Sequence, residues 1–225
     1  MNTKVVDFAK NLQAVEQDCR RFCFMSRGRE FQLASIEQLD QLRGEAEDLK
    51  NEMVVQLEDE EAANAMLSYI YAIQSVALEL KMWVALKDDQ AVDAWGHLVE
   101  AQNCARWAGQ AYPGALDVDN VVRHLDVLER VLFPPQLFSS PAMLIRSSEC
   151  SICGEDYAEC PHVVGRAYMG EPCCQIIHKA ELDEVSIVEN PANKHCRIIS
   201  FSDGDVQRDP LTWRPVSIHD TEEGT

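Results

Sequence analysis

The sequence predicts an α+β fold: an antiparallel bundle of about five helices over residues 1–135, a small β module over 136–208 and a tail over 209–225. Three observations predict it. Apolar residues recur every three or four positions as far as residue 132, which is the repeat of amphipathic helices. After Pro134-Pro135 the segments become short and rich in β-formers, with turn residues between them. Cysteine and histidine then cluster within the β part.

Five stretches carry the helical repeat. They cover 4–24, about 35–57, 59–86, 89–111 and 117–132. The short turns between them, such as Lys87-Asp88-Asp89, predict antiparallel neighbours whose apolar stripes form the core. Ser35, with Gln38 three residues on, predicts the N-cap of the second helix.

The β part offers too little apolar sequence to hold itself together. Its predicted strands are 142–146, 173–177, 184–188 and 197–201. A module of this size buries a small core, and small cores usually need a disulfide or a metal ion for stability.

Four metal-ligand residues lie close together in this part: Cys150, Cys153, Cys160 and His162, with the spacing C-x2-C-x6-C-x-H. Three thiolates and one imidazole can complete a tetrahedron around Zn²⁺ and leave no position for water, as in structural zinc sites. A glycine follows the second cysteine, where the turn needs a flexible backbone. The sequence therefore predicts a structural Zn²⁺ ion.

The fourth ligand has alternatives. Cys173, Cys174 and His178 follow closely, and either cysteine can replace His162 in the set. Adjacent residues of a strand point to opposite faces, so at most one of the two cysteines faces the cluster easily.

The composition limits which binding partners and which cellular compartment we expect. Formal net charge is −18, and acidic residues are spread along the whole chain. General binding to nucleic acids or anionic membranes needs a basic surface, so these classes are disfavoured. No apolar run approaches the ~18 residues of a membrane span. The polar start and the odd count of nine cysteines predict a cytoplasmic protein that binds metal rather than forming disulfides.

Parts of the chain resemble two protein families, and these resemblances suggest a biological setting for the chain. The segments LKDDQAVDAWGHLVEAQNCARWA (86–108) and ECSICGEDYAECPHVVGRAYMGEPC (149–173) resemble an uncharacterised bacterial family with a helical part and a Cys3His knuckle. The segment ELDEVSIVENPANKHCRI (181–198) resembles the terminal strand motif of phage prohead maturation proteases. That family uses a serine in a Gly-Leu-Ser-type motif and an upstream histidine, which are missing here. Ser186 lies in the later strand, so the resemblance implies a remnant without catalytic apparatus in a phage or anti-phage context.

A short basic patch stands out against the acidic background. Arg20, Arg21, Arg27 and Arg29 lie around a predicted helix end and suit a phosphate, an RNA or an acidic partner. The alternative is a solvated face on which the arginines pair with nearby acids such as Asp18.

Arg123 and His124 are adjacent, and adjacent helical residues point about 100° apart. They therefore do not form a shared catalytic face.

These observations favour a non-enzymatic interaction or adaptor subunit of a bacterial or phage-related assembly, including anti-phage defence. We expect protein partners in a larger complex and self-association through exposed Trp83 or Trp107. Two alternatives remain: a nucleic-acid-associated zinc protein that uses the Arg20–Arg29 patch, and a degenerate prohead protease-like hydrolase. The sequence holds no phosphate-binding glycine loop, G-x-S-x-G or H-E-x-x-H motif.

Overall fold

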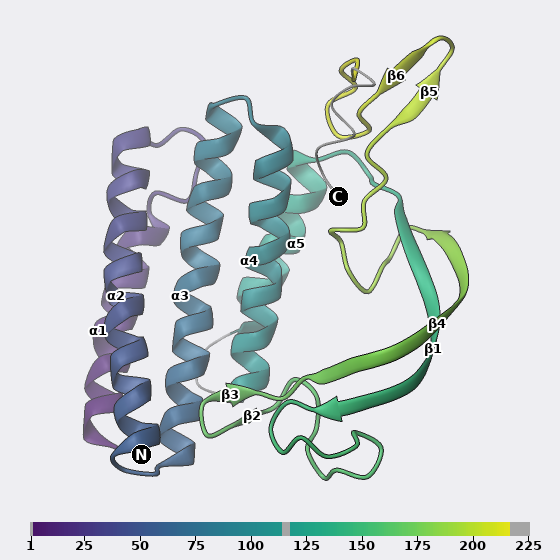
Figure 1. Cartoon of the computed structure of the whole chain (residues 1–225). Coiled ribbons are helices and arrows are strands. Elements are labelled where there is room, and N and C mark those ends of the chain that lie inside the picture. The colour runs from purple at the N-terminus through teal and green to yellow at the C-terminus, as the bar shows by residue number, and fades with distance from the viewer. Residues whose placement is uncertain (1, 114–117, 217–225) are drawn as a thin grey trace. The chain divides into compact units, whose positions relative to one another are not determined.

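The computed structural model describes residues 2–113 and 118–216 (Figure 1). Within these residues five α-helices come first, and six strands arranged as three two-stranded sheets follow. The predicted α+β fold, with helices before the β region, is confirmed. The predicted tail lies partly outside the described residues, from 217 to 225.

The helices correspond to the five apolar repeats, with shifted ends. They are α1 (Thr3–Arg20), α2 (Arg29–Val55), α3 (Glu60–Lys87), α4 (Ala91–Ala111) and α5 (Val118–Leu132). None of the helices in the described part is both long enough and apolar enough to cross a membrane.

Helix α3 is the central element of the bundle, because it packs against α1, α2 and α4. Side chains are buried around most of its circumference. Small residues on α4 allow close approach, and two serine hydroxyls of α3 donate across the contact. Ser68 donates to the carbonyl of Ala108 (2.8 Å) and Ser75 to that of Ala101 (2.9 Å).

The predicted start of α2 is wrong. The helix begins at Arg29, and Ser35 is a buried residue in its interior. Tertiary contacts hold the earlier turn: the ring of Phe31 stacks on Phe22 at 5.6 Å, and the Gln32 amide donates to the Phe22 carbonyl (2.9 Å). A local capping pattern does not report such contacts.

The strands of the described region pair as β1 (Phe138–Cys150) with β4 (Gln175–Val188), β2 (Ala167–Tyr168) with β3 (Glu171–Pro172), and β5 (Phe201–Asp203) with β6 (Val206–Arg208). The strands predicted at 142–146 and 184–188 lie inside β1 and β4. The segment predicted at 197–201 enters a strand only at Phe201, while Arg197 makes an isolated bridge to Phe138.

By contacts, the chain divides into two compact units. Met1–Asp126 and Ile145–Ala180 form the first, and Val127–Leu144 and Glu181–Thr225 form the second. The four predicted metal ligands therefore belong to the same unit as the greater part of the bundle. The domain boundary predicted after residue 135 stays a prediction.

Direct hydrogen bonds tie the β2–β3 hairpin to the bundle within the first unit. The Asn64 amide of α3 donates to the Ala167 carbonyl (3.1 Å) and accepts from the Gly170 N–H (2.8 Å). Lys50 of α2 donates to the Gly170 carbonyl (3.1 Å). Gly170 has φ +75°, and a Cβ there would lie 3.2 Å from the Lys50 side chain, so glycine suits both the turn and the contact.

The second unit is organised around Asp209. Its carboxylate accepts from the Arg197 guanidinium (2.9 Å), the Leu211 N–H (2.9 Å) and the Thr212 hydroxyl (3.0 Å). Burial acts to raise the pKa of this carboxyl, but these donors outweigh it, and the pKa is lowered.

Candidate metal centre

The first two sulfurs are placed by a tight turn at the end of β1. Cys150 is the last residue of the strand, and its carbonyl accepts from the Gly154 N–H (2.8 Å). Gly154 has φ +73°, a conformation that glycine adopts without strain. The Ile152 N–H points at the Cys150 sulfur (3.4 Å), as a backbone donor to a thiolate does. The predicted knuckle glycine is therefore in the conformation that the turn needs.

The other two donors come from Cys160-Pro161-His162. The His162 N–H points at the Cys160 sulfur (3.3 Å), and Nδ1 of the His162 ring lies 3.6 Å from that sulfur. The His162 imidazole and the Tyr168 ring make a T-shaped contact, with the centroids 4.6 Å apart. Tyr168 also accepts the Val163 N–H (3.1 Å), so this one side chain orients both the imidazole and the loop that follows it.

The structure brings all four predicted donors together. One ligand atom from each of Cys150, Cys153, Cys160 and His162 lies within 4.8 Å of the others. Sulfurs around a tetrahedral zinc ion are about 3.8 Å apart, given Zn–S bonds of about 2.3 Å. The cluster therefore has the size and the donor chemistry to bind one metal ion.

The alternative fourth ligands differ in their positions. The sulfur of Cys173, which is buried, lies 3.8 Å from the sulfur of Cys150. Cys174 is exposed, and Nε2 of His178 lies 3.0 Å from the Glu149 carboxylate. Cys173 is thus a fifth donor beside the cluster, whereas His178 has a carboxylate partner of its own.

The two neighbouring thiols at 3.8 Å have pKa values shifted in opposite directions. Burial acts to raise the pKa of Cys150, but the backbone N–H groups of Cys153 and Ile152 and the adjacent thiols lower it to about 6. Burial, followed by the interaction with Cys150, raises the pKa of Cys173 to about 11. Cys150 is therefore the more readily deprotonated of these two thiols.

The predicted arginine patch is largely paired with acids. Arg20 pairs with Glu16 (2.7 Å), Arg21 with Asp18 (3.3 Å), and Arg29 with Asp88 (2.8 Å). Arg27 lies in the connection between α1 and α2. The arrangement resembles the solvated, acid-paired face that the sequence offered as the alternative to a binding patch.

Three other residues named in the sequence analysis have defined positions. The Ser186 hydroxyl donates to the Glu184 carboxylate two residues away (3.2 Å). Of the two tryptophans considered for an interface, Trp83 is buried and Trp107 is exposed.

Sequence reasoning missed an ionic cluster inside the bundle. Glu79 of α3 is 1% exposed at its side chain, and its Oε1 lies 2.9 Å from Nε2 of His124 on α5. Its Oε2 lies 3.7 Å from the Arg20 guanidinium on α1. The hydrogen bond to Glu79 raises the pKa of His124 against the opposing effect of burial. The available signal was an acid within the apolar stretch of α3, but its partners come from two distant helices.

No protein-family model matches the chain, and no curated protein or solved structure matches it either.

Proposed function

We propose that the protein is a non-enzymatic interaction subunit whose 145–180 segment is held in shape by a structural Zn²⁺ ion and whose β1–β4 ribbon binds a protein partner. The observation that carries the proposal is the apolar surface that the ribbon leaves open to solvent. The assignment to a bacterial or phage-related assembly rests on the sequence resemblance and is part of the proposal.

The donor set supports zinc in a structural role. A site of three thiolates and an imidazole favours zinc, whereas magnesium and calcium prefer oxygen ligands. Four protein donors also fill the tetrahedron, whereas a catalytic zinc keeps one position for water. The ion would fix the loop between β1 and β2, which contains little other regular structure.

The ribbon exposes large apolar side chains along both of its strands. Within the second unit these are Met143 and Leu144 on β1 and Leu182, Val185 and Ile187 on β4. Leu182 and Ile187 are 64% and 68% exposed. Side chains alternate between faces along a strand, so Leu182 lies on one face of the ribbon and Val185 and Ile187 on the other. An isolated two-stranded ribbon is marginally stable in water, and a partner that covers these side chains would stabilise it.

The negative charge of the ribbon indicates what kind of partner surface would complement it. Glu181, Asp183 and Glu184 lie between the exposed apolar residues of β4, and the whole chain carries −18. A second copy would bring like charges together, whereas a different protein with an apolar groove bordered by lysine and arginine would complement the surface. Among the described residues, β4 has one edge that β1 does not cover, and a strand of the partner can add there, whereas the other edge of β1 is bridged at Phe138 by Arg197 and at Glu149 by Asp156.

The test compares tagged full-length protein with a ribbon variant, Leu182→Thr/Val185→Thr/Ile187→Thr, which keeps β-forming residues but shortens the apolar side chains. The matched control is Val55→Thr, because Val55 is 76% exposed at the end of α2. We expect a stoichiometric host protein to co-purify with wild type and the control and to be lost with the ribbon variant.

A photo-crosslinking residue at position 182, but not at position 55, should form an adduct with the same protein. The purified partner should bind the ribbon variant at least about tenfold more weakly than wild type. Equal recovery with all three proteins would contradict the proposal, as would a homodimer without another protein. Nuclease-sensitive material in place of a protein would favour the nucleic-acid alternative, and the acid-paired arginines would then be the next residues to change.

A further inference from the structure

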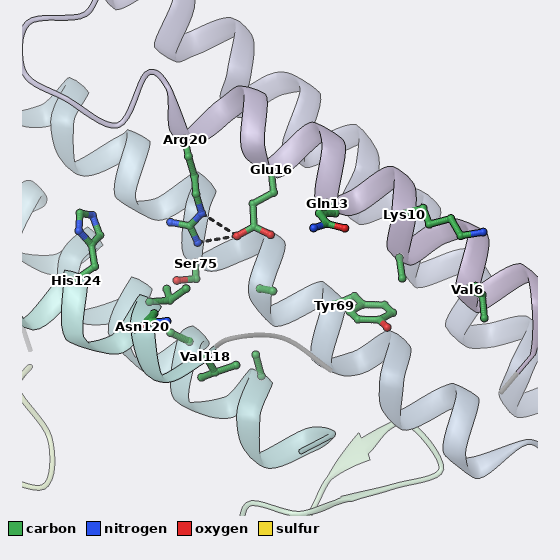
Figure 2. Close-up of a pocket in the computed structure, with 15 residues that line it drawn as sticks. Val6, Lys10, Gln13, Glu16, Arg20, Tyr69, Ser75, Val118, Asn120 and His124 are labelled. Atoms are coloured by element: carbon green, nitrogen blue, oxygen red, sulfur yellow. Dashed lines mark hydrogen bonds and ion pairs between the residues drawn. The ribbon is translucent and has the colours of Figure 1, made fainter. Parts of the chain in front are cut away.

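A cavity of about 660 Å³ lies inside the first unit, between α1, α3, α4 and α5 (Figure 2). Its volume is within the range of about 300–1,000 Å³ that small-molecule sites occupy. In Figure 2, Arg20, Glu16 and Gln13 extend from α1, Tyr69 and Ser75 from α3, and Asn120 and His124 from α5.

Much of the lining is aliphatic. The apolar side chains that contribute to it are Val6, Ala9, Ala72, Ala105, Ala108, Val118 and Val121. The four alanines leave the space open, because a larger residue on α3 or α4 would occupy it. A hydrocarbon or aromatic body that enters this space leaves water for an apolar surface, which is favourable.

Among the described residues, one part of the cavity lining is ionic and contains hydrogen-bond donors that have no acceptor within hydrogen-bond distance. Arg20 contacts one carboxylate oxygen of Glu16 through both Nε (2.8 Å) and Nη2 (2.7 Å). Its Nη1 lies 3.7 Å from the buried Glu79, which is too far for a hydrogen bond. A carboxylate only accepts, so Nε2 of His124 carries the proton in its 2.9 Å contact with Glu79, and Nδ1 is left for another partner. The carboxylates of Glu16 and Glu79 are already engaged, whereas guanidinium N–H groups remain available.

Tyr69 adds a further polar group to the cavity. Its side chain lines the cavity and is only 3% exposed, and its ring stacks on Phe8 at 6.2 Å. Among the described residues its hydroxyl has no hydrogen-bond partner. The hydroxyl oxygen opens on the cavity, where it can donate a hydrogen bond to a bound polar group.

We propose that this cavity binds a small amphipathic organic acid, with its apolar body against the alanines and valines and its anionic group on the Arg20 guanidinium. The charge of the ligand follows from the polar groups of the cavity that are still able to bind it. Arg20 offers only donors, and the acidic side chains that would attract a cationic ligand already pair with Arg20 and His124. Lys10 also lines the cavity, but its ammonium group pairs with Asp7 (3.3 Å), so Arg20 is the residue that binds the anionic group. This site is separate from the metal cluster and does not depend on the ribbon's role.

The probes are three molecules with one chain length and different head groups: decanoate, n-decanol and decyltrimethylammonium. Each is titrated into the full-length protein by calorimetry. We expect one decanoate per chain and at least about tenfold weaker binding of the alcohol and the cation, because a charge-assisted hydrogen bond is lost. In amide NMR spectra, decanoate should shift resonances of α1, α3 and α5 around the cavity.

Arg20→Gln should weaken the binding of decanoate by about tenfold or more. The matched control Arg21→Gln should keep the affinity within about twofold of wild type, because Arg21 pairs with the exposed Asp18. Ala72→Leu should fill the cavity and weaken binding of decanoate. If Arg20→Gln does not fold, Tyr69→Phe keeps the ring, removes only the hydroxyl and should weaken decanoate severalfold. No binding of decanoate, tighter binding of the cation, equal effects of the two arginine variants, or an unchanged affinity in Ala72→Leu would each overturn the proposal.

Discussion

His124 on α5 holds its Nε2 2.9 Å from Oε1 of Glu79 on α3, and that carboxylate is almost completely buried. Burying an ionised carboxylate is unfavourable unless donors surround it. His124 and the Arg20 guanidinium, 3.7 Å from the other carboxylate oxygen, supply that compensation from two different helices. The pair therefore links α5 to the centre of the bundle through a polar contact.

This pair predicts a pH dependence of stability. Glu79 raises the pKa of His124 in the folded chain, so the charged imidazole contributes stability that is fully present below its unfolded pKa of about 6.5 and is lost as pH rises through the folded value. We expect the free energy of unfolding of His124→Gln to fall below that of wild type most strongly at low pH. Urea unfolding of both proteins between about pH 5.5 and 8.5 measures this difference.

His97 is a control with the opposite sign. Burial, followed by the charge of Lys81, lowers the pKa of His97, so its protonation opposes folding at low pH. His97→Gln should therefore gain stability relative to wild type as pH falls. A difference between wild type and His124→Gln that does not change with pH would show that the Glu79 contact carries no charge-dependent stability.

The contrast between this pair and the metal cluster shows where sequence reasoning succeeds. The cluster spans Cys150 to His162, so its geometry depends on one turn and one C-x-H step that a spacing pattern can encode. Glu79 and His124 are 45 residues apart and meet only after the helices pack. For the same reason the repeat predicts five helices, yet the start of α2 is decided by the contact of Phe31 with Phe22 from the preceding segment.

Loss of a zinc ligand should have a local effect. We expect Cys153→Ser to lose bound zinc and to unfold the 145–180 segment while the helices persist, because all the ligands come from that segment. Hydrogen exchange should show faster exchange there and little change in α2 and α3, and metal analysis should show less than one zinc per chain. Cys174→Ser is the control, since Cys174 is exposed. Thermal unfolding and zinc content identical to wild type in Cys153→Ser would refute the structural role.

The identity of the fourth ligand gives a separate prediction. The Nδ1 atom of His162 lies 3.6 Å from the Cys160 sulfur, inside the four-residue cluster, whereas Cys173 contacts the cluster through Cys150 at 3.8 Å. We expect His162→Ala to weaken zinc binding by at least about tenfold, and Cys173→Ala to keep one zinc per chain with a smaller loss of affinity. Competition with a chromophoric chelator measures both affinities. The reverse order of effects would make Cys173 the fourth ligand.

In the second unit, the Arg197–Asp209 pair should dominate stability. Their side chains are 6% and 12% exposed, and the contact is 2.9 Å, so removing Arg197 leaves a nearly buried carboxylate. We expect Arg197→Ala to lower the free energy of unfolding of this unit by roughly 3 kcal/mol.

The matched control is Arg208→Ala, whose ion pair with Asp203 at 2.7 Å is more exposed and should change that free energy by less than about 1 kcal/mol. Because the pKa of Asp209 is lowered in the folded chain, the wild-type contribution is present above the unfolded pKa of about 3.9 and is lost as pH falls through the folded value. Native-state hydrogen exchange of β5 and β6 reports this unit by itself. Equal losses in the two arginine variants would mean that burial of the pair does not set the stability of the unit.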